Sequence, residues 1–227
     1  MRLRNIPRAE GTLQAHSAVI KHPEKQKGRW SELFGNTNPI HIEIGMGKGR
    51  FILDMAAAHP DINYIGIERY SSVLLRAVEK FDTEAFCELK NVRFVCMDAK
   101  EVGDVFEPSE IARIYLNFSD PWPKARHARR RLTSVEFLRR YEKILQKEGT
   151  LEFKTDNTDL FNFSLEQVKE AGWVLSQFTY DLHHNEAMNT GNVMTEYEEK
   201  FSQKGNPINK LIAVNCASSK VHEQLSF

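Results

Sequence analysis

From residue 39 onward, short apolar runs alternate with longer segments in which apolar residues recur every three or four positions. Short apolar runs are typical of buried strands, and the wider spacing is typical of helices that pack on one side. Strands are therefore predicted at residues 40–44, 62–67, 92–97, 111–116, 150–154, 173–182 and 210–215. The alternation predicts an α/β fold: a Rossmann-like, doubly wound and mostly parallel sheet with helices on both faces.

The predicted helices lie between these strands. They are expected at residues 51–56, 71–81, 133–145, 159–171 and 196–203. Thr133 and Glu136 match a capping box at the start of the third of these helices, and Gly149 fits its end. Gly172 is expected to close the fourth helix.

The chain divides into a short polar segment and one domain. Residues 1–29 are basic and show no sustained period, so they are predicted to form an arm that orders only on contact. Residues 30–227 are expected to form a single domain. No apolar segment is long enough to cross a bilayer and no secretory signal is visible. The three cysteines show no CxxC spacing and are expected to be reduced, so a cytoplasmic protein is expected.

The zero net charge of the chain conceals a strong segregation of charge. Residues 1–30 hold seven Lys and Arg against two Asp and Glu, and residues 124–147 hold nine against two. These balances of +5 and +7 leave −12 for the remaining segments, because the 31 basic and 31 acidic residues cancel. Such segregation favours a surface that binds a polyanion.

A glycine-rich turn, Glu43-Ile-Gly45-Met-Gly47-Lys-Gly49, follows the first predicted strand. A dinucleotide fingerprint would require a third glycine where this chain has Arg50. The acid-x-Gly-x-Gly spacing instead resembles the S-adenosylmethionine site of Rossmann-like methyltransferases. The alternative interpretation is a glycine-rich turn with a purely structural role.

Acidic residues stand at the ends of four successive predicted strands, and they are Glu43, Glu68, Asp98 and Asp120. Ligands of doubly wound sheets bind at the carboxyl ends of the strands, where the strand order reverses. A cofactor site is therefore predicted there, although each acid taken singly could be a helix cap.

The segment 117–131 joins a rigid acidic turn to a basic cluster. Asp120 precedes Pro121-Trp-Pro123, and five Lys or Arg side chains follow within residues 124–131. Prolines stiffen the backbone around Trp122, and clustered arginines suit a phosphate-binding surface. This pattern predicts a reaction site beside a nucleic-acid surface; a proline turn before a solvated helix is the alternative.

These segments closely resemble the bacterial tRNA (guanine-N7-)-methyltransferase family. The resemblance rests on residues 42–49, 66–69, 115–124, 153–156 and 194–199 and extends over about residues 30–215. Ser119-Asp-Pro-Trp-Pro-Lys124 and Thr195-Glu-Tyr-Glu198 are its most specific motifs.

The resemblance implies a seven-stranded, mostly parallel sheet with a reversed last strand. It implies methyl transfer from S-adenosylmethionine to N7 of a guanosine in the tRNA variable loop, at position 46 in tRNA, with Asp120 as the catalytic residue. The implied cofactor-binding residues are Glu43, Gly45, Gly47, Glu68, Asp98, Ala99 and Asp120. The implied tRNA-binding residues are Lys124, Arg126, Arg129, Arg130, Arg131, Asp156, Thr195, Glu196, Tyr197 and Glu198.

Three other functions stay open from the residues alone. They are a methyltransferase acting on another nucleic acid or on protein, a nicotinamide dehydrogenase, and an RNA-binding module without catalysis. Arg50 and the lack of a catalytic His or Tyr/Lys arrangement disfavour the dehydrogenase. No Cys/His/Asp grouping has the spacing of metal ligands, so no metal is expected, and the sequence leaves both a monomer and a homodimer open.

Overall fold

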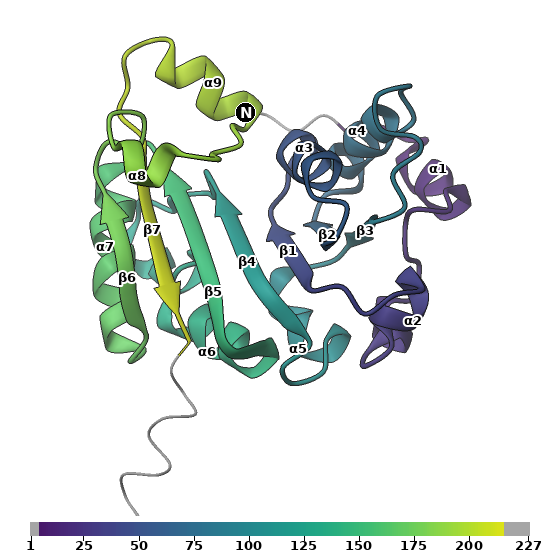
Figure 1. Cartoon of the computed structure of the whole chain (residues 1–227), viewed down its shortest axis with the longest axis horizontal. Coiled ribbons are helices and arrows are strands. Elements are labelled where there is room, and N and C mark those ends of the chain that lie inside the picture. The colour runs from purple at the N-terminus through teal and green to yellow at the C-terminus, as the bar shows by residue number, and fades with distance from the viewer. Residues whose placement is uncertain (1–4, 216–227) are drawn as a thin grey trace, which may run out of the picture.

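Seven strands form one sheet in the order β3-β2-β1-β4-β5-β7-β6 (Figure 1). The computed structural model describes residues 5–215. The strands are β1 (Ile40–Ile44), β2 (Asn63–Glu68), β3 (Val92–Cys96), β4 (Ile111–Asn117), β5 (Leu145–Thr155), β6 (Val174–Thr179) and β7 (Asn209–Val214). All seven lie where the apolar runs predicted strands.

The order of the strands reverses between β1 and β4. β1 pairs in parallel with both β2 and β4, so the chain winds outward in two directions from this point. β7 inserts between β5 and β6 and runs antiparallel to both. The doubly wound sheet with a reversed last strand is thereby confirmed, and a ligand site is expected above β1 and β4.

Helices cover both faces of the sheet, as predicted. They are α1 (Ala9–Ala15), α2 (Trp30–Phe34), α3 (Arg50–Ala58), α4 (Ser71–Phe81), α5 (Val102–Val105), α6 (Val135–Ile144), α7 (Thr158–Glu170), α8 (Glu186–Asn189) and α9 (Glu196–Ser202), with 3-10 turns η1 (Pro23–Gln26), η2 (Ala99–Glu101) and η3 (Ala125–Arg130). Helices α3 and α4 lie in front of β1–β3 in Figure 1, and α5, α6 and α7 lie behind the sheet. Two apolar cores result, one on each face.

The start and end of α6 differ from the prediction. The capping box is wrong: Ser134 is the N-cap and makes no side-chain cap, while the Thr133 hydroxyl pairs with Ser164 on α7 at 2.7 Å. A buried hydroxyl needs a partner, and the neighbouring helix supplies it. Gly149 does not end the helix either, since α6 runs directly into β5 and Gly149 lies inside that strand. Gly172, with a φ of +78°, does follow the end of α7 as predicted.

The described part of the expected arm, residues 5–29, is folded onto the domain. Leu13 of α1 is buried in the core beside α4. Ala18 and Ile20 exchange backbone hydrogen bonds of 2.8 and 2.9 Å with Phe94, so this segment pairs with the edge of β3. The prediction of an arm that orders only on contact is corrected for these residues, because short-range periodicity could not reveal pairing to a distant strand. Residues 1–4 lie outside the described range.

Candidate active site and nucleic-acid interface

The glycine turn after β1 is fixed by two different requirements. Gly47 has a φ of +60°, its N–H donates to Glu68 at 3.1 Å, and a Cβ built on it would face open space. Gly49 has a φ of +75°, and a Cβ there would come within 2.7 Å of the Ala77 Cβ. Gly49 therefore allows α3 to pack against α4, and Gly47 leaves room in front of the turn.

Glu43 is a buried carboxylate at the end of β1. Its Oε1 accepts a 2.9 Å hydrogen bond from the Asn117 side-chain amide, and within the described chain its Oε2 has no partner. Burial raises the pKa of Glu43 to about 8, while Asn117 and Lys154 oppose the rise. A buried acceptor without a partner suits a cationic or hydrogen-bonding ligand group.

Two of the other predicted acids come together near this turn. Glu68, at the end of β2, accepts from Gly47 and Tyr70 backbone N–H groups at 3.1 and 3.0 Å. Burial raises the pKa of Glu68, and the charge of Asp120 adds to that rise. Asp120 is exposed three residues beyond the end of β4, so its carboxylate is open to a ligand.

Asp98 lies two residues beyond the end of β3. It caps η2 by accepting from the Lys100 N–H at 3.0 Å, and its other oxygen lies 3.6 Å from Arg69. The helix-cap interpretation thus holds for one oxygen. The carboxylate is part-exposed, as is Ala99 beside it, so both stand at the same strand edge as Glu68.

The residues present fit S-adenosylmethionine. The unpartnered Oε2 of Glu43 and the open space before Gly47 mark a cradle at the end of β1. Glu43 would face the positively charged amino-acid part of the molecule, and Glu68 would accept hydrogen bonds from its ribose. Both interactions need hydrogen-bond acceptors on the protein, and the two carboxylates beside the turn provide them.

The turn after β4 is strained and held by an arginine. Phe118 and Trp122 have φ values of +52° and +42°, which residues other than glycine rarely adopt. The Arg131 guanidinium donates to the Pro121 and Trp122 carbonyls at 2.9 and 3.2 Å, and it lies over the Phe163 ring. Arg131 therefore fixes the turn that presents Asp120.

The neighbouring arginines remain on the surface. Arg126, Arg129 and Arg130 are exposed, as is Lys124. Arg129 pairs with Glu136 at 3.0 Å, and Arg130 lies 5.0 Å from the Trp122 ring centre. Trp122 packs on this basic segment, with its ring 5.7 Å from that of His127, and it belongs to neither main core cluster. The basic cluster thus begins at the strained turn itself.

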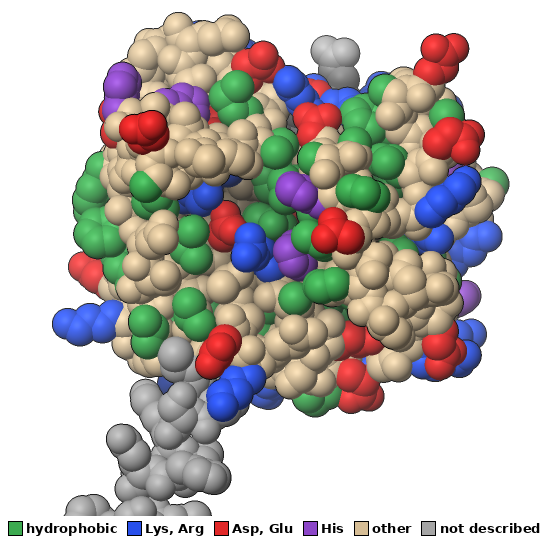
Figure 2. Space-filling view, viewed as in Figure 1, with side chains coloured by type: hydrophobic (Ala, Val, Ile, Leu, Met, Phe, Trp, Pro, Cys, Tyr) green, Lys and Arg blue, Asp and Glu red, His purple; other side chains and the backbone are tan. Residues whose placement is uncertain are grey.

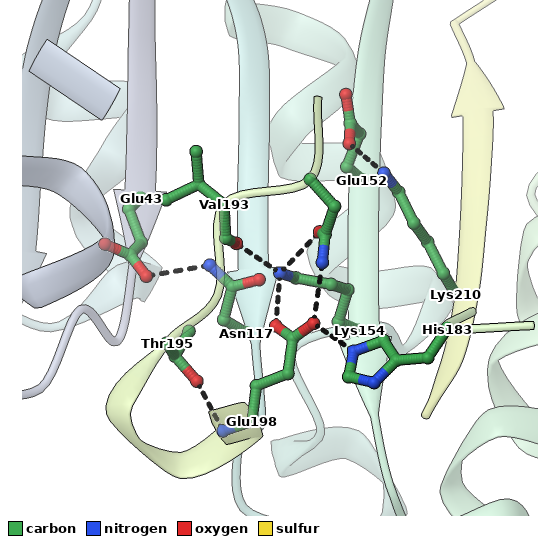
Figure 3. A network of polar contacts seen from close by, with 10 residues as sticks. Glu43, Asn117, Glu152, Lys154, His183, Val193, Thr195, Glu198 and Lys210 are labelled. Atoms are coloured by element: carbon green, nitrogen blue, oxygen red, sulfur yellow. Dashed lines mark hydrogen bonds and ion pairs between the residues drawn. The ribbon is translucent and has the colours of Figure 1, made fainter. Parts of the chain in front are cut away.

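The Thr195-Glu-Tyr-Glu198 motif forms the start of α9. Thr195 is its N-cap and accepts from the Glu198 N–H at 2.9 Å. Figure 3 shows Glu198 pointing toward Lys154 of β5. The Lys154 ammonium donates to Glu198 Oε2 at 2.6 Å. Glu198 is fully buried, and Lys154 is 4% exposed.

The outward side chains of α9 contact both halves of the site. Glu196 pairs with Lys80 and lies 3.7 Å from Lys48 in the glycine turn. The Tyr197 hydroxyl donates to Asp156 at 3.2 Å, and its ring lies 4.9 Å from that of Phe118. The predicted substrate motif therefore stands between the glycine turn and the exit of β4.

Comparison with known proteins agrees with this geometry. A family model described as a putative methyltransferase matches residues 37–211. The tRNA (guanine-N(7)-)-methyltransferase of Lachnoclostridium phytofermentans is 59% identical over 94% of this chain and 98% of its own length. That of Bacillus subtilis is 51% identical over 92% of this chain and 96% of its own.

The chain belongs to the tRNA (guanine-N(7)-)-methyltransferase family. Solved structures share the fold at lower identity. The 16S rRNA methyltransferase KamB is 13% identical, with a TM-score of 0.61 over 82% of this chain and 92% of its own. An antibiotic-related methyltransferase is 18% identical, with a TM-score of 0.59 over the same shares.

Two of the residues that the family resemblance assigned to tRNA are engaged within the protein. Glu198 cannot meet a base edge in this arrangement, because it is fully buried and both oxygens are bonded to Lys154, His183 and Asn192. Arg131 is engaged with the turn after β4 and is only part-exposed. Glu198 and Arg131 therefore contact groups of the protein itself, and their part in tRNA binding stays a prediction.

Sequence reasoning missed Asn117, Phe118, Lys154 and His183 as members of the site. A signal for Lys154 was present, since it lies in Phe153-Lys-Thr-Asp156, one of the stretches that carry the family resemblance. Nothing local marked His183, whose partner Glu198 follows fifteen residues later.

A hollow opens below this site on the sheet face that α3 and α4 leave uncovered. Figure 2 shows Lys, Arg, Asp, Glu and His side chains gathered in it. The cavity measures about 280 Å³, and its polar lining includes Arg113, Asn117, Glu152, Lys154 and Lys210. Within residues 5–215 no three His, Cys, Asp or Glu side chains are grouped to hold a metal ion.

Proposed function

We propose that this protein transfers a methyl group from S-adenosylmethionine to N7 of a guanosine in tRNA, in the variable loop at position 46. Relatives that match over nearly their whole length are named tRNA (guanine-N(7)-)-methyltransferase. The main support is the meeting of three motifs: α9 contacts the glycine turn through Glu196 and the β4 exit through Tyr197. The donor cradle and the substrate motif are thus neighbours in the fold.

When bound, S-adenosylmethionine supplies an electrophilic methyl group on a sulfonium. Guanine N7 has a lone pair and no proton, so Asp120 has no proton to remove there. The methylated guanine is cationic, and the exposed Asp120 carboxylate would orient the base and stabilise the developing charge. Asp156 would accept from the N1–H and N2–H edge of guanine, which distinguishes it from adenine.

Arg126, Arg129 and Arg130 would contact the tRNA backbone beside the turn. Their exposure and the local charge balance support this role. A guanosine held in the folded tRNA has to be exposed or flipped before N7 reaches the site, at a cost of a few kcal/mol. Phosphate contacts from these arginines would offset that cost.

The decisive experiment treats unmodified tRNA with the protein and S-adenosylmethionine and maps the modified nucleotide by mass spectrometry. The expected product is 7-methylguanosine in the variable loop. A methyl group on another base, or on protein, would replace the proposed substrate. Calorimetry with S-adenosylmethionine separates the enzyme from an RNA-binding module, which would show no binding.

Under this proposal the protein acts in the cytoplasm, where tRNA is matured. No helix among residues 5–215 is long and apolar enough to span a membrane. Light scattering at assay concentration would distinguish a monomer from a homodimer.

A further inference from the structure

The Lys154 ammonium lies at the end of β5, beneath the loop that leads into α9. All three of its hydrogen-bond acceptors come from one segment of the chain (Figure 3). They are Asn192 Oδ1 at 3.2 Å, the Val193 carbonyl at 2.9 Å and Glu198 Oε2 at 2.6 Å. An ammonium has three N–H donors, so Lys154 has no donor left for another ligand.

Glu198 closes the same network from the other side. Its second oxygen accepts from Asn192 Nδ2 at 2.8 Å and lies 3.0 Å from His183 Nε2. Burial would raise the pKa of Glu198, but Lys154, His183 and Asn192 together hold it below its ordinary value. The carboxylate is therefore ionised, and residues 183, 192, 193 and 198 are tied to one buried charge pair.

This segment has limited apolar anchorage. Val193 packs against the core on the α3 and α4 side, Leu182, Met188 and Ile208 form a small separate apolar cluster, and Thr190, Gly191 and Asn192 line the open cavity. The outward contacts of α9, Glu196 to Lys80 and Glu199 to Arg50, are part-exposed ion pairs. Exposed pairs contribute little to stability, whereas removing one partner of a buried pair has a large effect.

We infer that Lys154 is a positioning residue of the methyl-transfer reaction: through Glu198 it sets the place of Thr195 and Tyr197 between the glycine turn and the exit of β4. The inference rests on the proposed function and assigns Lys154 and Glu198 no contact with guanine. A misplacement of about 1 Å at a reacting site lowers the rate roughly a hundredfold. The anchor therefore governs the placement of the substrate motif, while the charge of Lys154 also opposes the rise in the pKa of Glu43 in the donor cradle.

The test compares Lys154→Met with Lys210→Met as a matched control. Lys210 is also buried, lines the same cavity and pairs with a glutamate, Glu152, at 3.1 Å. Within the described chain it makes no hydrogen bond to residues 183–198. Folded Lys154→Met should lose about a hundredfold in kcat/KM for tRNA. Because Lys154 also opposes the raised pKa of Glu43, the dissociation constant for S-adenosylmethionine is compared at about pH 9, above that pKa, where it should change far less than kcat/KM.

Hydrogen exchange supplies a readout that does not depend on activity. Amides of residues 183–198 should exchange faster in Lys154→Met and stay protected in Lys210→Met. Glu198→Gln should reproduce the loss, and the double variant should be no worse than either single one, because the two residues act as a unit.

Several results would overturn the inference. One is full activity of folded Lys154→Met; another is an equal loss in Lys210→Met; a third is a parallel loss of donor binding, which would indicate general damage. If Lys154→Met does not fold, His183→Gln removes a part-exposed member of the network and should show the same split on a smaller scale. A wild-type protein that fails to methylate tRNA would instead refute the proposed function, and the exchange data would still report on the anchor.

Discussion

The Asn117 side-chain amide at the end of β4 donates to only one of the two oxygens of Glu43 on the neighbouring strand β1, at 2.9 Å. The other oxygen is buried and has no partner among residues 5–215. This half-satisfied carboxylate lies beside the glycine turn, so its protonation state is linked to what binds there.

The first prediction concerns the pH dependence of donor binding. Burial raises the pKa of Glu43 to about 8, so most of the unliganded protein carries a proton there at pH 7. A cationic donor favours the ionised form, and affinity should therefore rise with pH below 8, by up to about tenfold per unit, and level off above it. Glu43→Gln should remove this component, leaving only the titration of the donor itself.

Calorimetry of S-adenosylmethionine binding between pH 6 and 9, in buffers of different ionisation heat, measures both affinity and proton release. Wild type should release a proton that Glu43→Gln does not. Identical proton release by the two proteins would show that Glu43 does not titrate on binding.

The second prediction concerns Asp120. Asp120→Asn keeps the shape of the side chain and removes its charge, so stabilisation of the cationic product should be lost. At saturating tRNA and S-adenosylmethionine, kcat should fall about a hundredfold, a magnitude typical for one electrostatic group. Rapid-quench turnover measurements check this. Wild-type kcat in the variant would exclude the electrostatic role.

The third prediction separates recognition of guanine from the packing of α9. Asp156→Ala should lower the preference for guanosine over inosine at the target position by roughly 10–100-fold, since inosine lacks the N2 amine. The matched control is Tyr197→Phe, which removes the 3.2 Å hydrogen bond to Asp156 but keeps both the carboxylate and the ring stack on Phe201.

The ratio of kcat/KM for the two tRNAs is the measurement. Tyr197→Phe should retain most of the preference. If both variants lost it equally, Asp156 would matter only for holding Tyr197, and the contact with guanine would be refuted.

The fourth prediction divides the arginines after β4 into two groups. Changing Arg126, Arg129 and Arg130 to Ala should flatten the log–log salt dependence of tRNA binding by roughly 0.7–0.9 for each phosphate that the protein no longer neutralises. Donor affinity should be unchanged. Filter binding over a range of salt concentrations gives the slope. An unaltered slope would show that these arginines do not contact tRNA phosphates.

Arg131→Ala should behave differently from that triple variant. Arg131 donates to the Pro121 and Trp122 carbonyls, so its loss should release the strained turn and lower kcat with little change of the salt slope. If Arg131→Ala reduced the salt slope as the triple variant does, Arg131 would instead be a residue that contacts the tRNA backbone.

The strands and the acids at their ends could be predicted without any knowledge of the fold. Buried parallel strands are continuous apolar runs, and the spacing of apolar residues changes between strand and helix. Both features can therefore be recognised in short stretches of sequence. The glycine turn and the Asp120 motif were readable for the same reason, since Gly and Pro act through their own backbone geometry.

The partners of the polar side chains, in contrast, became visible only in the folded molecule. Thr133 pairs with Ser164 instead of capping its own helix, residues 18–20 pair with Phe94, and Glu198 turns inward to Lys154 instead of outward to substrate. A buried polar group must find a partner, but that partner can come from any element that packing brings near. Such pairings join residues tens of positions apart, which no local pattern encodes.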